Sequence, residues 1–153
     1  MYIVVMIAEN LHKLIWLSRP MMQAAEACVE AGLQGTALTV RMRAILEILR
    51  RYGDQTVPDI AARLEIKRQY VQLMVNETLS GGLVVQRANP RHQRSPKMVL
   101  TDRGRALIDD IIARELALMQ GIGEGLNDEE IATALKVMLA VTGKLKDLAG
   151  TRP

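Results

Sequence analysis

The segment 66–76 combines side chains that recognise the edges of DNA bases. Its polar positions are basic or carry an amide or a hydroxyl, and it contains no Asp or Glu. In the major groove arginine pairs with guanine, and glutamine or asparagine pairs with adenine, through two parallel hydrogen bonds. A solvated helix face is the alternative, but such a face usually includes acidic residues. The predicted base-contacting residues are Lys67, Arg68, Gln69, Gln72 and Asn76.

A second set of side chains is suited to the phosphate backbone and the minor groove. Lys67 lies where a helix N-terminus favours anions, and Tyr70 offers a hydroxyl to a phosphate. The turn 88–95 is rich in basic residues, and arginine is attracted to the negative potential of a narrow minor groove. The alternative is a flexible basic loop without a partner. The further predicted contacts are Arg87, Arg91, Arg94, Lys97 and Arg103.

Two helices must position the first set. Thr56 predicts a helix start, because Asp59 three residues later completes a capping box and a proline falls in the first turn. A turn at 65–67 leads to a second helix over 68–79, which a Gly-Gly pair ends. Apolar positions form a packing stripe opposite the polar face of this helix. The predicted stripe consists of Val71, Met74, Val75 and Thr78.

Two strands, 83–87 and 97–101, are predicted to form a hairpin around the basic turn. This order of elements is that of a winged helix-turn-helix, in which the second helix enters the major groove. A helix over 9–31 is also predicted, with a kink or a new turn at Pro20. Further helices follow the hairpin. The predicted fold class is therefore mainly α with a small β-hairpin wing.

The chain of 153 residues is expected to form one domain, 1–153. Within it, 36–104 is the expected DNA-binding lobe, and 1–35 and 105–153 supply dimerisation helices. A homodimer is expected, because two recognition helices about 34 Å apart read a palindromic site. Its interface stripes are expected among Ile3, Val4, Val5 and Ile7, and among Ile131, Leu135, Val137, Met138, Leu139 and Val141.

The helix-turn-helix, the Gly-Leu-Val after it and the Leu100-Thr101-x-x-Gly104 that closes the wing resemble the MarR family of bacterial winged-helix transcription regulators. The resemblance spans most of the chain and implies a homodimer that represses transcription, with activation as the alternative. The wing of the family often carries Asp-x-Arg. Here Arg94 is present, but His92 stands at the Asp position.

The resemblance also implies a small aromatic or anionic effector that weakens DNA binding. Its pocket is expected between the dimer helices and the DNA-binding lobe, although Met-rich stripes are more often plain core. The expected pocket residues are His12, Trp16, Met42 and Ile45.

Cys28 is the single cysteine, so no disulfide or cysteine-based zinc site forms within one chain, and a cytoplasmic location is expected. Glu26 and Glu30 disfavour a thiolate at this position. A buried, inert thiol is therefore expected rather than an oxidation sensor.

The net charge of +3 is unevenly distributed, since residues 63–105 hold nine Lys/Arg against three Asp/Glu. A basic segment of this kind favours a polyanionic partner. No Gly-rich phosphate loop or nucleophile elbow is present, so neither an enzyme nor a cofactor or metal site is expected. The alternative function is a winged helix that binds an acidic protein instead of DNA. The operator, the effector and the choice between Met1 and Met6 as the start are left open.

Overall fold

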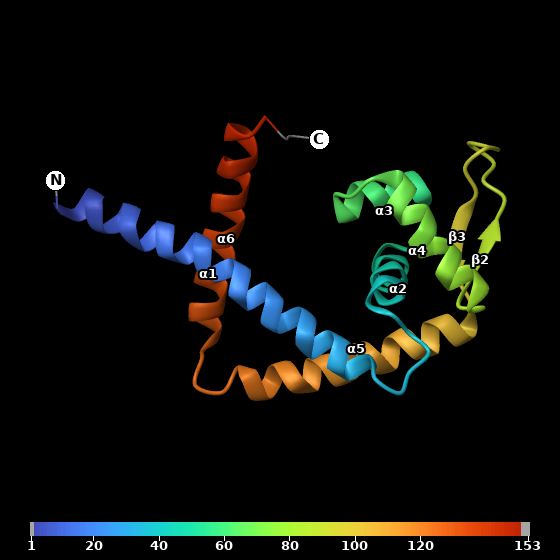
Figure 1. The fold of residues 1–153 in the computed structure, drawn as a ribbon, viewed down its shortest axis with the longest axis horizontal. Coiled ribbons are helices and arrows are strands. Elements are labelled where there is room, and N and C mark those ends of the chain that lie inside the picture. Colours follow the sequence, from blue (N-terminus) through green and yellow to red (C-terminus); the bar gives the residue numbers. More distant parts are fainter. Residues whose placement is uncertain (1, 151–153) are drawn as a thin grey trace. The chain divides into compact units, whose positions relative to one another are not determined.

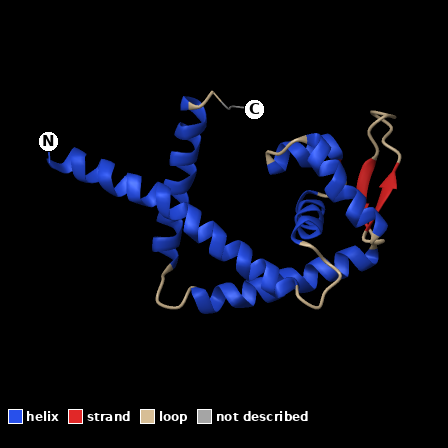
Figure 2. Ribbon diagram, in the orientation of Figure 1, coloured by secondary structure: helices blue, strands red, loops and turns tan. Residues whose placement is uncertain are grey.

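The computed structural model describes the backbone of residues 2–150 and the side chains of residues 5–150. Two of the expected interface residues, Ile3 and Val4, thus lie outside the described side chains. The chain divides into two compact units, residues 1–115 and 116–153. Six helices and three short strands confirm the predicted class (Figures 1 and 2). The elements are α1 (Tyr2–Leu33), α2 (Val40–Tyr52), β1 (Gln55–Thr56), α3 (Val57–Leu64), α4 (Arg68–Ser80), β2 (Val84–Arg87), β3 (Lys97–Leu100), α5 (Asp102–Ile122) and α6 (Asp128–Leu148).

Side-chain caps determine where the helices of the first unit begin. The backbone N–H of Met42 donates to Thr39 Oγ1 at 3.1 Å and starts α2. The capping box predicted for α3 is confirmed. The N–H of Asp59 donates to Thr56 Oγ1 at 3.3 Å, and the N–H of Thr56 donates to Asp59 Oδ2 at 3.1 Å. Glu65, in the left-handed conformation with φ 55°, then ends α3 and turns the chain towards α4.

The core of the first unit forms where α2 packs against α4. All four residues of the stripe predicted on α4 are buried. Ile60 of α3 and Ile108 of α5 are fully buried beside them. Burying one such side chain contributes about 1.5–3 kcal/mol, so this packing holds the inner face of α4 firmly and leaves its outer face free. The buried residues of α2 are Met42, Ile45, Leu46 and Leu49.

The wing is part of a three-stranded antiparallel sheet in the order β1-β3-β2. Strands β2 and β3 pair from Val84 opposite Leu100 to Arg87 opposite Lys97, close to the predicted hairpin. Strand β1, which pairs Thr56 with Lys97, was not predicted. It is two residues long, and two residues are too few to show an alternating pattern.

Thr101 and Gly104 join the wing to α5. The N–H of Thr101 donates to Leu83 O at 3.0 Å, and its hydroxyl donates to Gly82 O at 2.9 Å. The same hydroxyl oxygen accepts the N–H of Gly104 at 3.0 Å. A Cβ atom on Gly104 would lie 2.0 Å from Leu83 O. This approach therefore requires glycine, which gives the Leu-Thr-x-x-Gly sequence a structural role.

Two ion pairs bind α2 to α5. The guanidinium of Arg43 forms two hydrogen bonds with Glu115, one of them from Nε to Oε1 at 2.6 Å, and Nη1 donates to Glu47 at 2.6 Å. The bond with Glu115 raises the pKa of Arg43 above its usual range, against the opposing effect of burial. Arg50 of α2 pairs with Asp109 of α5.

Helix α1 runs without interruption from Tyr2 to Leu33, with Pro20 inside it. The predicted start at residue 9 was therefore wrong, and Pro20 does not end the helix. The hydrogen bond that proline cannot donate falls on an exposed stretch of the helix, which lowers the cost of the missing bond. The C-terminal end of α1 reaches the core through Leu33. Cys28 is exposed, so the expected burial of its thiol was also wrong.

The second unit contains the end of α5 and the whole of α6. Asn127 and Glu130 form a capping box at the start of α6. No residue of α6 is buried. None of the helices described here combines the length and the apolarity needed to cross a membrane. The exposed large apolar residues of this unit include Leu116, Leu118, Met119, Ile122, Ile131, Leu135, Met138 and Leu139.

Candidate nucleic-acid interface

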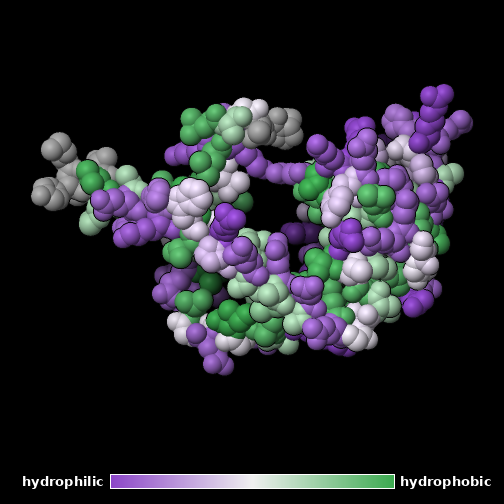
Figure 3. All heavy atoms as spheres, viewed as in Figure 1, coloured by the Kyte–Doolittle hydropathy of each residue, from purple (hydrophilic) through white to green (hydrophobic). Residues whose placement is uncertain are grey.

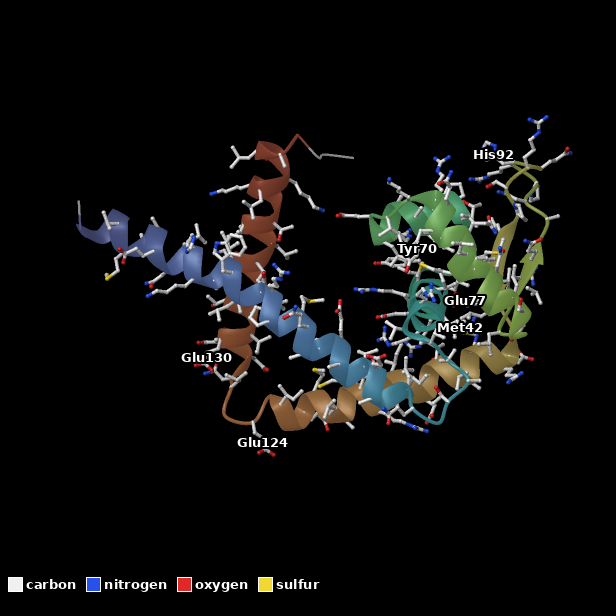
Figure 4. All side chains as sticks on the ribbon, viewed as in Figure 1. Met42, Tyr70, Glu77, His92, Glu124 and Glu130 are labelled. Carbon is white, nitrogen blue, oxygen red and sulfur yellow. The ribbon has the colours of Figure 1, made fainter. Side chains whose placement is uncertain are left out.

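The outer face of α4 presents every side chain predicted to contact bases. All of these side chains are exposed, and the opposite face of the helix is buried in the core. Tyr70 is 45% exposed and lies on the same helix (Figure 4). Lys67 is the N-cap residue and makes no side-chain capping bond. The N–H groups of the first turn are thus not satisfied by a side-chain cap. The outer residues are Lys67, Arg68, Gln69, Gln72 and Asn76.

Residues from α4 and from the wing line one groove of about 340 Å³. Arg68, Gln69 and Gln72 enter it from α4, and Arg94 enters it from the loop between β2 and β3. The structure thus brings together two sets of residues that lie more than twenty positions apart in the sequence. Within the part of the chain that the structure describes, no acidic residue lines this groove. Its two donor-rich walls suit a polyanion that carries hydrogen-bonding groups.

Gln86 is a further polar residue of this groove. It was not among the predicted site residues, and it lies on β2 opposite Met98 of β3. Its signal in the sequence was weak, because a single glutamine in a short strand indicates only that one face of the strand is polar. Its exposed amide is chemically equivalent to those on α4.

Two of the residues predicted to read bases contact each other. Gln72 Nε2 donates to Asn76 Oδ1 at 2.9 Å, one helical turn apart on the exposed face. Glutamine and asparagine at this spacing form such a bond on an isolated helix as well. Gln72 Nε2 and Asn76 Oδ1 therefore already have a partner in the free protein, and a base edge at these two atoms would compete with this bond.

The loop between β2 and β3 carries the basic residues of the wing. Arg91 and Arg94 are exposed, and His92 lies at the tip of the loop (Figure 4). Hydrophilic side chains gather over this part of the molecule (Figure 3). Lys97 is half-buried beside Thr56 of β1. A second hollow of about 640 Å³ lies at the base of the loop, and it is lined by Arg91, Arg94 and Lys97 together with Asp54 and Asp59.

The remaining predicted backbone contacts already have partners. Arg87 Nη1 lies 3.6 Å from Asp54 Oδ2 in an exposed ion pair. Arg103 Nη1 donates to Gly81 O at 3.4 Å. Exposed ion pairs of this kind contribute little to stability. A phosphate would thus compete with weakly held partners at both positions.

Polar contacts hold α4 against the start of α2 and cap the start of α3. Glu77 of α4 accepts a hydrogen bond from Thr39 Oγ1 at 3.3 Å and lies 3.5 Å from Arg41 of α2. Hydrogen bonds from Thr56 hold the pKa of Asp59 below its ordinary value. The Asp59 carboxylate is therefore charged near neutral pH and keeps the start of α3 capped.

The four residues expected to wall an effector pocket are not gathered within one chain. Met42 and Ile45 are buried in the core. His12 and Trp16 are exposed on α1, where Trp16 Nε1 donates to His12 Nε2 at 3.0 Å. They precede the point where α1 meets the core by about 25–30 Å of helix. Among the described residues, no cluster of three His, Cys, Asp or Glu side chains is suited to hold a metal.

Comparison with known proteins identifies the family. The sequence profile of the MarR family matches residues 23–95. A Mycobacterium tuberculosis protein is 36% identical over 72 residues, which are 47% of this chain and 50% of that protein, so the match spans about half the length of this relative. The HTH-type transcriptional repressor MdtR of Bacillus subtilis is 29% identical over 107 residues, covering 70% of this chain and 66% of that protein.

Solved structures extend the likeness over nearly the whole chain. FabT of Streptococcus pneumoniae, solved in complex with DNA, is 18% identical with a TM-score of 0.75, covering 90% of this chain and 98% of that one. BpsR of Bordetella bronchiseptica, whose DNA binding is regulated by 6-hydroxynicotinic acid, is 21% identical with a TM-score of 0.71, covering 82% and 90%. At these identities the two structures support the fold alone. The crystal structure of a MarR family transcription regulator is 36% identical with a TM-score of 0.85, covering 95% of this chain and 96% of that one. This chain therefore belongs to the MarR family, whose members are transcription regulators rather than enzymes.

Proposed function

We propose that this protein is a sequence-specific DNA-binding repressor of transcription. The observation that carries the proposal is the groove that Arg68, Gln69, Gln72 and Arg94 line without an acidic residue. Helix α4 lies in the major groove and reads bases through these amide and guanidinium groups. The loop with Arg91 and Arg94 contacts the adjacent minor groove. Residues 36–104 act as the DNA-binding lobe.

Related proteins support both the binding of DNA and the repression of transcription. FabT, which shares the fold, was solved with DNA, and MdtR is described as a repressor. A cytoplasmic location fits this function, because the chain binds DNA in the proposal and has a single cysteine. Activation stays the alternative output, because occupancy of an operator does not by itself set the direction of regulation.

We infer that the functional form is a homodimer built from residues 1–35 and 105–153. The support is the large apolar side chains that the terminal helices expose, since exposed apolar surface of this kind marks an interaction site. Trp16 and Leu17 on α1 are 61% and 65% exposed, and Leu139 on α6 is 73% exposed. A twofold dimer presents two copies of α4 to successive major grooves about 34 Å apart.

Release by a small aromatic or anionic effector completes the proposal. The regulation of BpsR by 6-hydroxynicotinic acid is the precedent within the fold. Because His12 and Trp16 lie far along α1 from Met42 and Ile45, one chain does not form the site from these four residues. A titration with hydroxylated aromatic acids that leaves DNA affinity and Tm unchanged would remove this part of the proposal.

Fluorescence anisotropy with the DNA upstream of its own gene, at two salt concentrations, tests the function. Replacing Arg68 or Gln72 by alanine is expected to cost about 1–3 kcal/mol of binding and to relax sequence preference. Arg94→Ala is expected to weaken binding and to reduce the salt slope by about one. Arg51→Ala, on the exposed face of α2 and outside this groove, is the matched control and should change neither quantity.

The competing function is a winged helix that docks on an acidic protein. It shares the basic groove but requires no base recognition. Binding that prefers the upstream duplex by about 10³ over a scrambled one supports the repressor. Equal, weak and salt-sensitive binding to both duplexes supports the protein-binding function instead.

A further inference from the structure

We propose that Asn89 is a positioning residue that holds the wing arginines ready for DNA. The inference rests on the proposed function, and it concerns a residue that makes no predicted contact with DNA itself. Asn89 is 7% exposed, although it lies in a loop that is otherwise mostly exposed. A buried amide in such a loop requires partners, because an unsatisfied amide is costly to remove from water.

The amide of Asn89 closes the loop from both sides. Its Nδ2 donates to the backbone oxygen of Ser95 at 3.1 Å, across the loop. Its Oδ1 accepts the N–H of Arg91 at 3.2 Å, which is the two-residue spacing of an Asx turn. One side chain thus links the segment that follows β2 to the segment that precedes β3.

Backbone bonds continue the same framework. The N–H of His92 donates to Asn89 O at 3.1 Å, and the N–H of Ser95 donates to His92 O at 3.0 Å. The sheet itself does not reach this far, since its last pair is Arg87 opposite Lys97. Residues 88–96 therefore depend on Asn89 and these two turn bonds for their shape.

The arginines lie inside this framework. Arg91 follows Asn89 by two residues and donates its N–H to it, and Arg94 immediately precedes Ser95. Both side chains are exposed and make contact with the hollow at the base of the loop. Ordering a loop upon binding costs free energy, so a loop that is already ordered binds DNA more tightly with the same contacts.

The first test does not involve DNA. Backbone ¹⁵N relaxation is measured on the full-length protein for residues 91–94, in wild type, Asn89→Ala and Gln93→Ala. Gln93 is exposed on the same loop and serves as the matched control. We expect order parameters near 0.85 in wild type and in Gln93→Ala, and below about 0.6 in Asn89→Ala. Unchanged order parameters in Asn89→Ala overturn the inference, whether or not the protein binds DNA.

Asn89→Asp separates the two bonds and covers the case in which the alanine variant does not fold. Its carboxylate still accepts the N–H of Arg91 but has no N–H to donate to Ser95 O. We expect order at Arg91 to be retained and order at Arg94 to fall. Equal order at both positions contradicts the role assigned to the Nδ2 bond.

The second test asks whether Asn89 acts through the arginines. Asn89→Ala is expected to weaken binding to the upstream duplex about three- to tenfold, with unchanged far-UV circular dichroism. In a background with Arg91→Ala and Arg94→Ala, the same substitution should cost less than about twofold, because coupled residues are not additive. An equal loss in both backgrounds refutes positioning. Failure of the wild type to bind any duplex refutes the proposed function and leaves the relaxation test decisive for Asn89.

Discussion

Replacing Gly104 by alanine tests the close approach of α5 to the turn after α4. The new Cβ would lie 2.0 Å from Leu83 O, 2.9 Å from Leu83 C and 3.2 Å from Leu83 Cα. Ordinary contact begins at 3.4 Å, so the two backbones must separate by more than 1 Å. No rotation of a side chain relieves this contact, because all three atoms belong to the main chain.

The cost follows from what the separation disturbs. Leu83 is 1% exposed, and its carbonyl accepts the N–H of Thr101 at 3.0 Å. Overpacking a core costs about 1–3 kcal/mol, and a lost hydrogen bond adds about 1 kcal/mol. Alanine offsets about 0.5–1 kcal/mol through its better helix propensity. We therefore expect Gly104→Ala to lower the free energy of unfolding by about 1–3.5 kcal/mol, and Tm by about 2–14 °C.

Urea denaturation followed by circular dichroism measures this change at one fixed protein concentration, since oligomer stability depends on concentration. Gly121→Ala is the control, because Gly121 lies in the same helix and a Cβ there meets nothing within 4 Å. It should be neutral or stabilise by up to about 1 kcal/mol. A Gly104→Ala protein as stable as Gly121→Ala would refute the reasoning.

Three further predictions concern polar contacts of the first unit. Glu115→Gln should lower the free energy of unfolding by about 1–2 kcal/mol, because it leaves the half-buried guanidinium of Arg43 with a weaker partner. The control is Asp110→Asn in an exposed pair, which should change this free energy by less than about 0.5 kcal/mol. Equal urea midpoints for the two variants would contradict this. Thr56→Ala should cost about 1 kcal/mol through the lost cap of α3, which a thermal melt against wild type will detect. The pKa of Asp59 is lowered in the folded state, so its contribution is present above the ordinary carboxyl pKa and is lost as pH falls through the lower folded value; Asp59→Asn should reduce the acid sensitivity of Tm in that range, and an unchanged acid profile would show that the contribution is absent.

Local signals in the sequence were sufficient for the helix-turn-helix. Thr56 with Asp59 is a chemical signature that acts over three residues, and the structure contains the box as predicted. The stripe on α4 depends only on helical period, which is why all four of its members are buried as predicted. The outer residues of α4 follow from the same period.

Features that depend on tertiary contacts were not predictable in this way. Strand β1 exists because β3 pairs with Gln55 and Thr56. No local sequence pattern predicts a pairing between segments so far apart in the chain. Cys28 was expected to be buried because its acidic neighbours disfavour a thiolate, but that reasoning does not determine which face of α1 is covered. Asn89 was predicted only as part of a turn. Asparagine in a turn often accepts a hydrogen bond from the backbone N–H two residues later, as Asn89 does from Arg91.

The bond between Gln72 and Asn76 gives α4 a resting state. A base pair that offers the wrong edge must compete with a satisfied pair of amides, while the matching edge replaces one good bond by two. In the proposed complex, this internal bond is a fixed cost that recognition by the two amides must offset. Only a base edge that returns more than one good bond offsets it, and a site that leaves the pair intact gains nothing from either amide.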